Sequence, residues 1–142
     1  MALTTIIALP LIVVFLTLSL WHVCWLLGGR VGRDAAIPEV EGKQVFQPSA
    51  AATIVVAVAL ALCALLLAAT AGLVPLPLPN TLLVWLTRTL AVVLLLRAIG
   101  DFRLVGFFKR IRNTHFARLD TLVYSPLCLL LAIGSFIVGF TP

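Results

Sequence analysis

The sequence predicts an all-α integral membrane protein in which residues 1–142 form one domain, a bundle of four transmembrane helices. Of its residues, 63% are hydrophobic and 11% are charged, whereas about a quarter of the residues in soluble domains are charged. A chain of this length cannot bury so much apolar surface in one water-soluble core. It also contains four apolar runs of about 20 residues or more, the length that a helix needs to cross the hydrocarbon core of a bilayer.

The first two apolar runs predict the first two spans. The first covers residues 4–27 and ends at two glycines followed by Arg30. It has no basic segment before it and no small-residue cleavage motif after it, so we expect a retained span rather than a signal peptide. The second covers residues 49–74 and is entered through Pro48. Both should be helical, because a helix satisfies its own backbone polar groups in lipid.

The third span is predicted over residues 80–100 and the fourth over residues 121–140. A short uncharged turn with alternating prolines joins the second span to the third, and its prolines make it stiff. Pro126 lies inside the fourth span, where its missing N–H removes one backbone hydrogen bond and should kink the helix.

Basic residues are distributed very unevenly between the connections. The connections over residues 28–48 and 101–120 contain eight of the ten Lys and Arg residues, and the two tails and the proline turn contain none. Positively charged loops remain in the cytoplasm. The sequence therefore predicts that both long connections are cytoplasmic and that both termini lie outside the cytoplasm.

The connection over residues 101–120 predicts a short amphipathic helix between the third and fourth spans. Its apolar side chains recur at i, i+3, i+4 and i+7, at positions Leu104, Phe107, Phe108 and Ile111. Such a helix would lie in the headgroup layer. The residues expected to contact headgroups are Lys109, Arg110, Arg112 and Arg118. The charges are explained equally by an anchor that sets topology and by a surface that recognises an anionic headgroup or substrate.

Arg88 is the costliest residue to place in a membrane. It lies roughly 12 Å from the outer end of the third span at the usual helical rise, near mid-bilayer, and no Asp or Glu is found at that depth. Its partner would be a backbone carbonyl, a hydroxyl, water, a bound anion or another subunit, and Trp85 three residues earlier can stack on it. A charge inside a span indicates a functional site, with structural hydrogen bonding as the alternative.

A second group of polar side chains is expected in one layer at the cytoplasmic ends of the spans. A His, two carboxylates, a phenol and guanidiniums in one layer can form a binding or proton-transfer site. Its predicted members are His22, Trp25, Arg97, Asp101, Arg103, Asp120 and Tyr124. Helical spacing favours an Arg97–Asp101 pair. The alternative is a hydrogen-bonded network that holds helix ends together.

No cofactor or metal site is predicted. Three cysteines lie inside apolar runs without framework spacing, and His22 and Cys24 are two residues apart, so they point to different helix faces. Phosphate-binding loops and nucleophile elbows are absent from the sequence. The basic residues lie beside apolar spans, which indicates anionic membrane lipids as partners and not nucleic acid.

Several motifs resemble those of a known protein family. They are GDFRLVGFFK at residues 100–109, FARLDT at 116–121, YSPLC at 124–128 and WHVCWLLGG at 21–29. They resemble the small bacterial four-span membrane proteins catalogued only as a domain of unknown function. The resemblance implies a multi-pass protein of the bacterial inner (cytoplasmic) membrane, and it brings no activity and no catalytic residues.

Three functional hypotheses follow. The first is a module that binds or moves an anionic lipid or small amphiphile at the cytoplasmic site, with Arg88 at the deeper end of the cavity. The second is an accessory subunit of a larger membrane complex, or a homo-oligomer, in which Arg88 pairs with a neighbouring carboxylate. The third is a small lipid-modifying enzyme in which His22 and Asp101 or Asp120 exchange protons. The sequence favours a non-enzymatic role.

Overall fold

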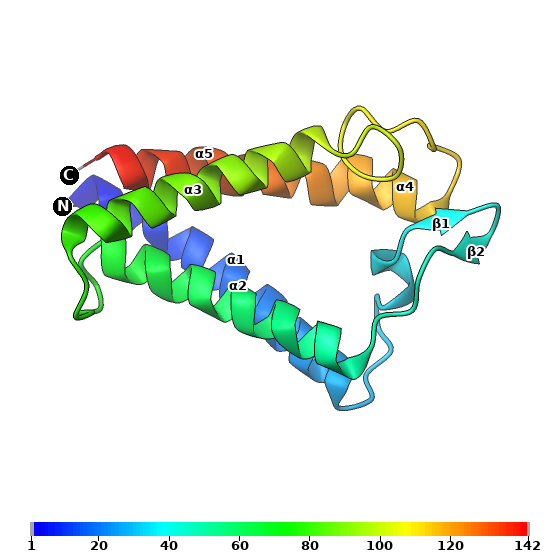
Figure 1. Ribbon diagram of the computed structural model, residues 1–142, viewed down its shortest axis with the longest axis horizontal. Coiled ribbons are helices and arrows are strands. Elements are labelled where there is room, and N and C mark those ends of the chain that lie inside the picture. Colours follow the sequence, from blue (N-terminus) through cyan, green and yellow to red (C-terminus); the bar gives the residue numbers. More distant parts are fainter. Residues whose placement is uncertain (1, 142) are drawn as a thin grey trace.

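The computed structural model describes residues 2–141 and has the predicted all-α membrane architecture (Figure 1). The long helices are α1 (Ala2–Leu26), α2 (Ala50–Thr70), α3 (Asn80–Ile99) and α5 (Ser125–Phe140). A short helix α4 (His115–Leu119) and a π-helical turn η2 (Asp120–Tyr124) run directly into α5. Four helical segments, the last of them His115–Phe140, are long and apolar enough to span a membrane.

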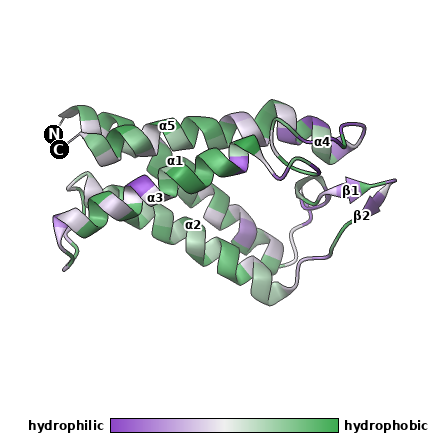
Figure 2. Cartoon of the chain, turned by 45° about the horizontal axis from the view of Figure 1, so that its top comes forward, coloured by the Kyte–Doolittle hydropathy of each residue, from purple (hydrophilic) through white to green (hydrophobic). Residues whose placement is uncertain are grey.

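The helices are arranged as two antiparallel pairs. Helix α1 packs along α2, and α3 packs along α5. The pairs meet at the end where both chain termini lie, which we call the terminus side, and diverge toward the other end, which we call the loop side (Figures 1 and 2). The helices consist mostly of hydrophobic residues (Figure 2). Many of their large apolar side chains are exposed on the surface of the bundle, as expected for helices in contact with lipid.

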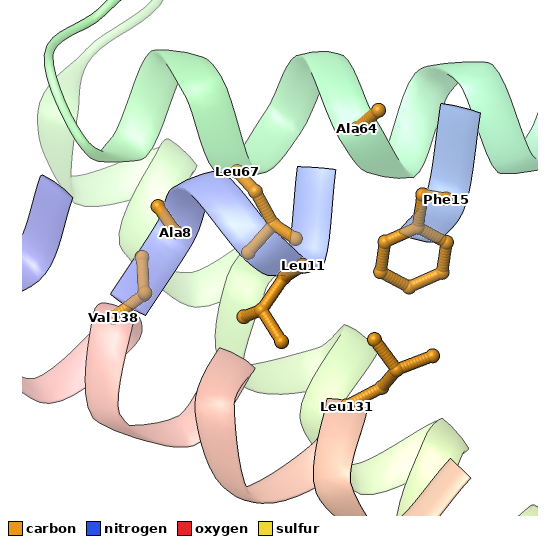
Figure 3. Close-up of a cluster of buried hydrophobic side chains, with 7 residues drawn as sticks. All are labelled: Ala8, Leu11, Phe15, Ala64, Leu67, Leu131 and Val138. Carbon is orange, nitrogen blue, oxygen red and sulfur yellow. The ribbon is translucent and has the colours of Figure 1, made fainter. Parts of the chain in front are cut away.

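A small apolar core joins the two pairs. Its buried members come from α1, α2 and α5 and are Ala8, Leu11, Phe15, Ala64, Leu67, Leu131 and Val138 (Figure 3). Gly134 allows α5 to approach α1 closely, because a Cβ atom at this position would lie 2.8 Å from the methyl carbons of Leu11. Between α2 and α3, the hydroxyls of Thr70 and Thr87 form a hydrogen bond of 2.8 Å.

The first long connection leads from the end of α1 toward α4 (Figure 1). It contains a 3-10 turn η1 (Asp34–Ala36) and two short antiparallel strands, β1 (Glu39–Val40) and β2 (Lys43–Gln44). The indole N–H groups of Trp21 and Trp25 both donate to the carbonyl of Val31, at 3.1 and 2.8 Å. These two bonds hold the start of the connection against the end of α1.

A π turn, η2, lies just before Pro126, the position at which the sequence predicted a kink. Pro126 is the second residue of α5, and the N–H of Ser125, directly before it, bonds to the carbonyl of Asp120 five residues earlier. A π turn is a common way for a helix to accept an interruption of its regular hydrogen bonds. The helix continues through this position with a wide turn.

The predicted amphipathic helix over residues 104–111 is wrong. Residues 101–114 form an irregular loop, and the backbone φ angles of Phe102 (+61°) and Gly106 (+87°) do not belong to a right-handed helix. The loop folds back on α3, where the N–H of Phe107 donates to the carbonyl of Ala98 at 2.9 Å. Bonds to the last carbonyls of α3 thus replace the bonds of a separate helix.

Candidate functional site

A buried ionic cluster lies at the loop side of α3 and α5. The carboxylate of Asp120 is completely buried and accepts hydrogen bonds from Arg97 Nη2 at 2.8 Å and from Lys109 Nζ at 2.9 Å. The backbone N–H of Gly106 donates to the same carboxylate at 2.7 Å. The cluster, which we define as Arg97, Lys109 and Asp120, therefore joins α3, the following loop and η2, and its formal charge is +1.

Lys109 is fully satisfied inside this cluster. Besides Asp120, its ammonium donates to the carbonyl of Gly106 at 2.9 Å and to the hydroxyl of Thr121 at 2.6 Å. Its side chain is completely buried, so the prediction that Lys109 contacts headgroups is wrong. The buried carboxylate explains the difference, because a buried ammonium needs an ionic partner.

Two glycines allow the loop to deliver Lys109 to Asp120. Gly100 and Gly106 both have positive φ angles, +99° and +87°, and their backbones touch. A Cβ atom on Gly100 would lie 1.9 Å from the carbonyl oxygen of Val105, and one on Gly106 would lie 2.3 Å from the Cα of Gly100. Only glycine fits at such contacts. The sequence analysis did not single out these two glycines, although a pair of glycines six residues apart after a span is the signal that could have indicated this loop.

The predicted pair between Arg97 and Asp101 does not form. Helix α3 ends at Ile99, so Asp101 has left the helix face on which a residue four positions after Arg97 would lie. Its carboxylate instead accepts three backbone N–H bonds of 2.7–3.0 Å from the residues two to four positions later. These bonds, with that from Val105 as the largest influence, lower the pKa of Asp101 below its usual value.

Arg97 keeps unused hydrogen-bonding capacity. Its Nη1 atom is buried and has no partner within residues 2–141, although the side chain as a whole is 34% exposed. The hydroxyl of Ser125, one turn beyond the Asp120 carboxylate, is also buried without a partner there. Buried polar atoms of this kind commonly mark the place of a bound water or ion.

Tyr124 connects the cluster region to the first long connection. Its hydroxyl donates to the carbonyl of Ala35 at 3.1 Å, and its ring lies 6.0 Å from that of Phe116. Tyr124 is therefore in the predicted layer, four residues after Asp120, and holds η1 over the loop side of α5.

His22 and Trp25 lie on the other helix pair. The Nδ1 atom of His22 is hydrogen-bonded to the carbonyl of Leu18 at 2.8 Å, and its ring centroid lies 4.7 Å from that of Trp25. The loop-side end of α1 diverges from the ends of α3 and α5 (Figure 1). The structure therefore does not bring His22 to Asp101 or Asp120.

The chain matches a family of proteins of unknown function, DUF3995, over residues 15–135. It belongs to this family. The match includes all members of the ionic cluster and both glycines of the loop. No curated protein and no solved structure matches the chain.

In this DUF3995 protein, Arg88 binds the end of helix α5. Its Nε donates to the carbonyl of Gly139 at 3.0 Å, and its guanidinium lies 3.9 Å from the Phe140 ring and 5.1 Å from the Trp85 ring. The predicted contact with Trp85 is confirmed, and a backbone carbonyl is the partner. Carbonyls in the last turn of a helix lack helical donors and attract cations.

Arg88 and Arg97 do not line one cavity. They are nine residues apart on α3, which places them on opposite faces of the helix at 100° per residue. Their partners, Gly139 and Asp120, lie at opposite ends of the α4–α5 segment. The structure thus divides the predicted site into three places: the ionic cluster, Arg88 on the terminus side, and His22 with Trp25 on α1.

Exposed basic residues lie on the loop and on α4, close in the chain to members of the ionic cluster. Arg103 on the loop and three of the four predicted headgroup residues are exposed: Arg110, Arg112 and Arg118. Arg112 also donates from Nε to the carbonyl of Lys109 at 3.1 Å. A separate cavity of about 380 Å³ in the first long connection is lined by Arg30, Arg33, Asp34 and Gln44 among others, and none of the predicted site residues lines it.

Proposed function

We propose that the protein binds an anionic lipid or small amphiphile at the loop side of α3 and α5, with the anionic group against Arg97. The observation that carries this proposal is the buried Nη1 atom of Arg97, which has no partner within residues 2–141. Leaving a charged donor buried and unbonded is costly. A phosphate or carboxylate oxygen at this position would remove that cost.

Charge favours an anionic ligand. The cluster holds two cations and one carboxylate, and Lys109 has no free donor. The remaining positive charge therefore belongs to Arg97, whose planar guanidinium suits carboxylate and phosphate groups. The exposed arginines close to the cluster in the chain add attraction for anions.

The surroundings favour a ligand from the membrane. Phe102 and Phe108 are 57% and 61% exposed on the loop, with ring centroids 6.4 Å apart, and Leu122 of η2 is 75% exposed. Exposed aromatic and aliphatic side chains next to arginines are typical of a lipid interface. By the positive-inside rule, the two basic loops favour the cytoplasmic face of the bacterial inner membrane for this site, with both termini outside.

The geometry gives less support to the other two hypotheses. An acid–base enzyme needs its groups around one substrate atom, but Asp101 and Asp120 are engaged in hydrogen bonds within the loop and the cluster. His22 lies on α1, in the other helix pair. The accessory-subunit hypothesis depends on Arg88 alone, which already has one hydrogen-bond partner within the chain, the carbonyl of Gly139, although this neutral group does not balance its charge.

Lipid retention tests the proposal. We expect native mass spectrometry to show phosphatidylglycerol bound in preference to phosphatidylcholine, and we expect Arg97→Gln to weaken phosphatidylglycerol binding about tenfold, the loss of one charge-assisted contact. Asp120 keeps Lys109 in this variant, so the fold is retained. Arg33→Gln, an exposed arginine of the other connection, is the matched control. Equal phosphatidylglycerol binding by the wild type and Arg97→Gln would disprove the proposal.

A further inference from the structure

We propose a second lipid site on the terminus side, where a groove between α3 and α5 holds an acyl chain of an anionic phospholipid and Arg88 binds its phosphate. The groove has a volume of about 200 Å³ and an almost wholly apolar lining. That lining includes Ala91, Val92 and Leu95 of α3 and Ala132, Ile133 and Phe136 of α5.

Arg88 carries a charge that the described chain does not neutralise. Its bond to Gly139 goes to a neutral carbonyl, and the ion pairs within residues 2–141 use Arg97 and Lys109 instead. The five Asp and Glu residues of the chain all lie in the two long connections or at the start of the fourth span. A charge in a transmembrane segment requires a counter-charge or polar surroundings, and a phospholipid phosphate is the anion that surrounds such a protein.

Two aromatic rings connect the Arg88 guanidinium to the groove. Arg88 lies over the ring of Phe140 at 3.9 Å, Phe140 stacks on Phe136 at 4.2 Å between centroids, and Phe136 lines the groove. On α3, Val92 lies one helical turn after Arg88 and therefore on the same face. A lipid with its phosphate at Arg88 would lay its chain along these residues toward Ile133.

Gly139 and two alanines make room for this arrangement. A Cβ atom at Gly139 would lie 3.2 Å from Cγ of Arg88, so glycine allows the arginine stem to approach α5. Ala91 and Ala132 form the buried floor of the groove. Val92 and Phe136 on its walls are half exposed, which opens the groove to the surrounding lipid.

The position of the site commits it to one leaflet. Gly139 is the penultimate residue of α5, so the Arg88 guanidinium is level with the terminus-side end of that helix, although the Arg88 backbone lies roughly 12 Å from the start of α3. The ionic cluster lies at the opposite end. The second site therefore takes a lipid from the leaflet opposite to that of the first, and it does not depend on the first site.

Fluorescence quenching of Trp85 tests this inference. In a Trp21→Phe/Trp25→Phe background, Trp85 is the single tryptophan and lies beside Arg88. We expect phosphatidylglycerol with brominated acyl chains, in vesicles, to bind at this site and quench Trp85 with an apparent affinity about fivefold higher than that of brominated phosphatidylcholine. A difference of this size is the usual effect of one basic residue on the binding of an anionic lipid. Equal quenching by the two lipids would overturn the inference.

Two further variants separate the headgroup contact from the groove. Arg88→Leu should abolish the preference for phosphatidylglycerol. Val92→Phe keeps Arg88 and fills the groove, so it should reduce quenching by both lipids, whereas Val93→Phe, exposed on the next position of α3, should not. An unchanged preference in Arg88→Leu, or equal quenching in Val92→Phe and Val93→Phe, would contradict the inference.

The same measurement distinguishes the two sites. Arg97→Gln should leave the lipid preference reported by Trp85 unchanged, since Arg97 points to the opposite face of α3 near its other end. A loss of that preference in Arg97→Gln would mean that Trp85 reports the first site and would overturn the second.

Discussion

Asp120 is the residue on which the loop-side structure depends. It is completely buried, and its two oxygens accept bonds from a guanidinium, an ammonium and a backbone N–H. Removing one member of a buried ionic group lowers the free energy of unfolding by more than the intact group contributes to it, because the remaining charges stay buried. The loss should therefore depend on which of the three cluster members is removed.

Asp120→Asn should lower the free energy of unfolding by about 3–5 kcal/mol, because it leaves Arg97 and Lys109 without a counter-charge. Unfolding the protein by titrating a denaturing detergent into mixed micelles measures this change. Lys109→Met is the matched comparison, since Asp120 keeps Arg97 and the loss should be smaller. A loss in Lys109→Met equal to or larger than that in Asp120→Asn would contradict this explanation.

Asp101 should stabilise the loop in a pH-dependent way. Because its pKa is lowered in the folded protein, its contribution is complete above the unfolded-state pKa of about 3.9 and is lost as pH falls through the lower folded-state pKa. Asp101→Ala should cost about 1 kcal/mol at pH 7, as for other carboxylates that bind several N–H groups. The difference between the wild type and the variant should begin to shrink as pH falls below about 4 in the same unfolding measurement, and a constant difference would refute this.

Among single residues, the sequence identified those that are energetically unfavourable in or beside a membrane span, but it did not identify all of their hydrogen-bond partners. Arg88, Arg97 and Asp120 were singled out because each is expensive to place beside or within a span. Helical spacing paired Arg97 with the wrong carboxylate, since it considers neighbours on one helix and the true partner is 23 positions away. Lys109 was assigned to the headgroups for the same reason.

Among the elements, the loop after α3 depends on backbone contact between Gly100 and Gly106. Both neighbouring atoms at that contact belong to the backbone, so a side chain at either position cannot be accommodated by a rotamer change. The loop would have to open, and Lys109 would leave Asp120.

Gly106→Ala should therefore destabilise the protein by about 3 kcal/mol or more, in the range of severe single substitutions. Gly42→Ala is the matched control. Gly42 also has a positive φ, +77°, but a Cβ atom there meets nothing within 4 Å, so it should cost about 1–2 kcal/mol from backbone strain alone. Equal losses in the two variants would show that the contact does not matter.

The spans could be predicted because hydropathy depends only on the local composition of the chain. The loop after α3 could not be predicted, because its backbone depends on tertiary contacts. The second and third spans, predicted over residues 49–74 and 80–100, are the helices Ala50–Thr70 and Asn80–Ile99. The apolar spacing in residues 104–111 favoured a helix, but tertiary bonds to Asp120 and to the end of α3 determine the backbone there.

The whole molecule is two helix pairs joined near one end. This arrangement could not be read from the four spans, because a hydropathy pattern does not determine which helices pack together. It separates His22 from the ionic cluster, although the sequence had placed them in one layer. The topology of four spans predicts that His22 and the ionic cluster lie in one layer of the membrane. The distance between them within that layer depends on how far the two helix pairs diverge.

Orientation in the membrane is a prediction for the whole chain. In a variant without the three native cysteines, a cysteine at Val45, in the first long connection, should react with an impermeant maleimide only after cells are permeabilised. A cysteine at Leu78, in the proline turn, should react in intact cells. Both native side chains are exposed, so accessibility in the protein is not limiting. The reverse labelling pattern would show that the basic loops lie outside.

The π turn η2 has a consequence for the rotational phase of the last helix. One extra residue in this turn rotates everything after it by about 100° relative to an uninterrupted α-helix. With this offset, Asp120 points to Arg97 while Gly134 faces Leu11 and Gly139 faces Arg88. A chain one residue shorter between Asp120 and Tyr124 could keep the first contact or the other two, but not all three.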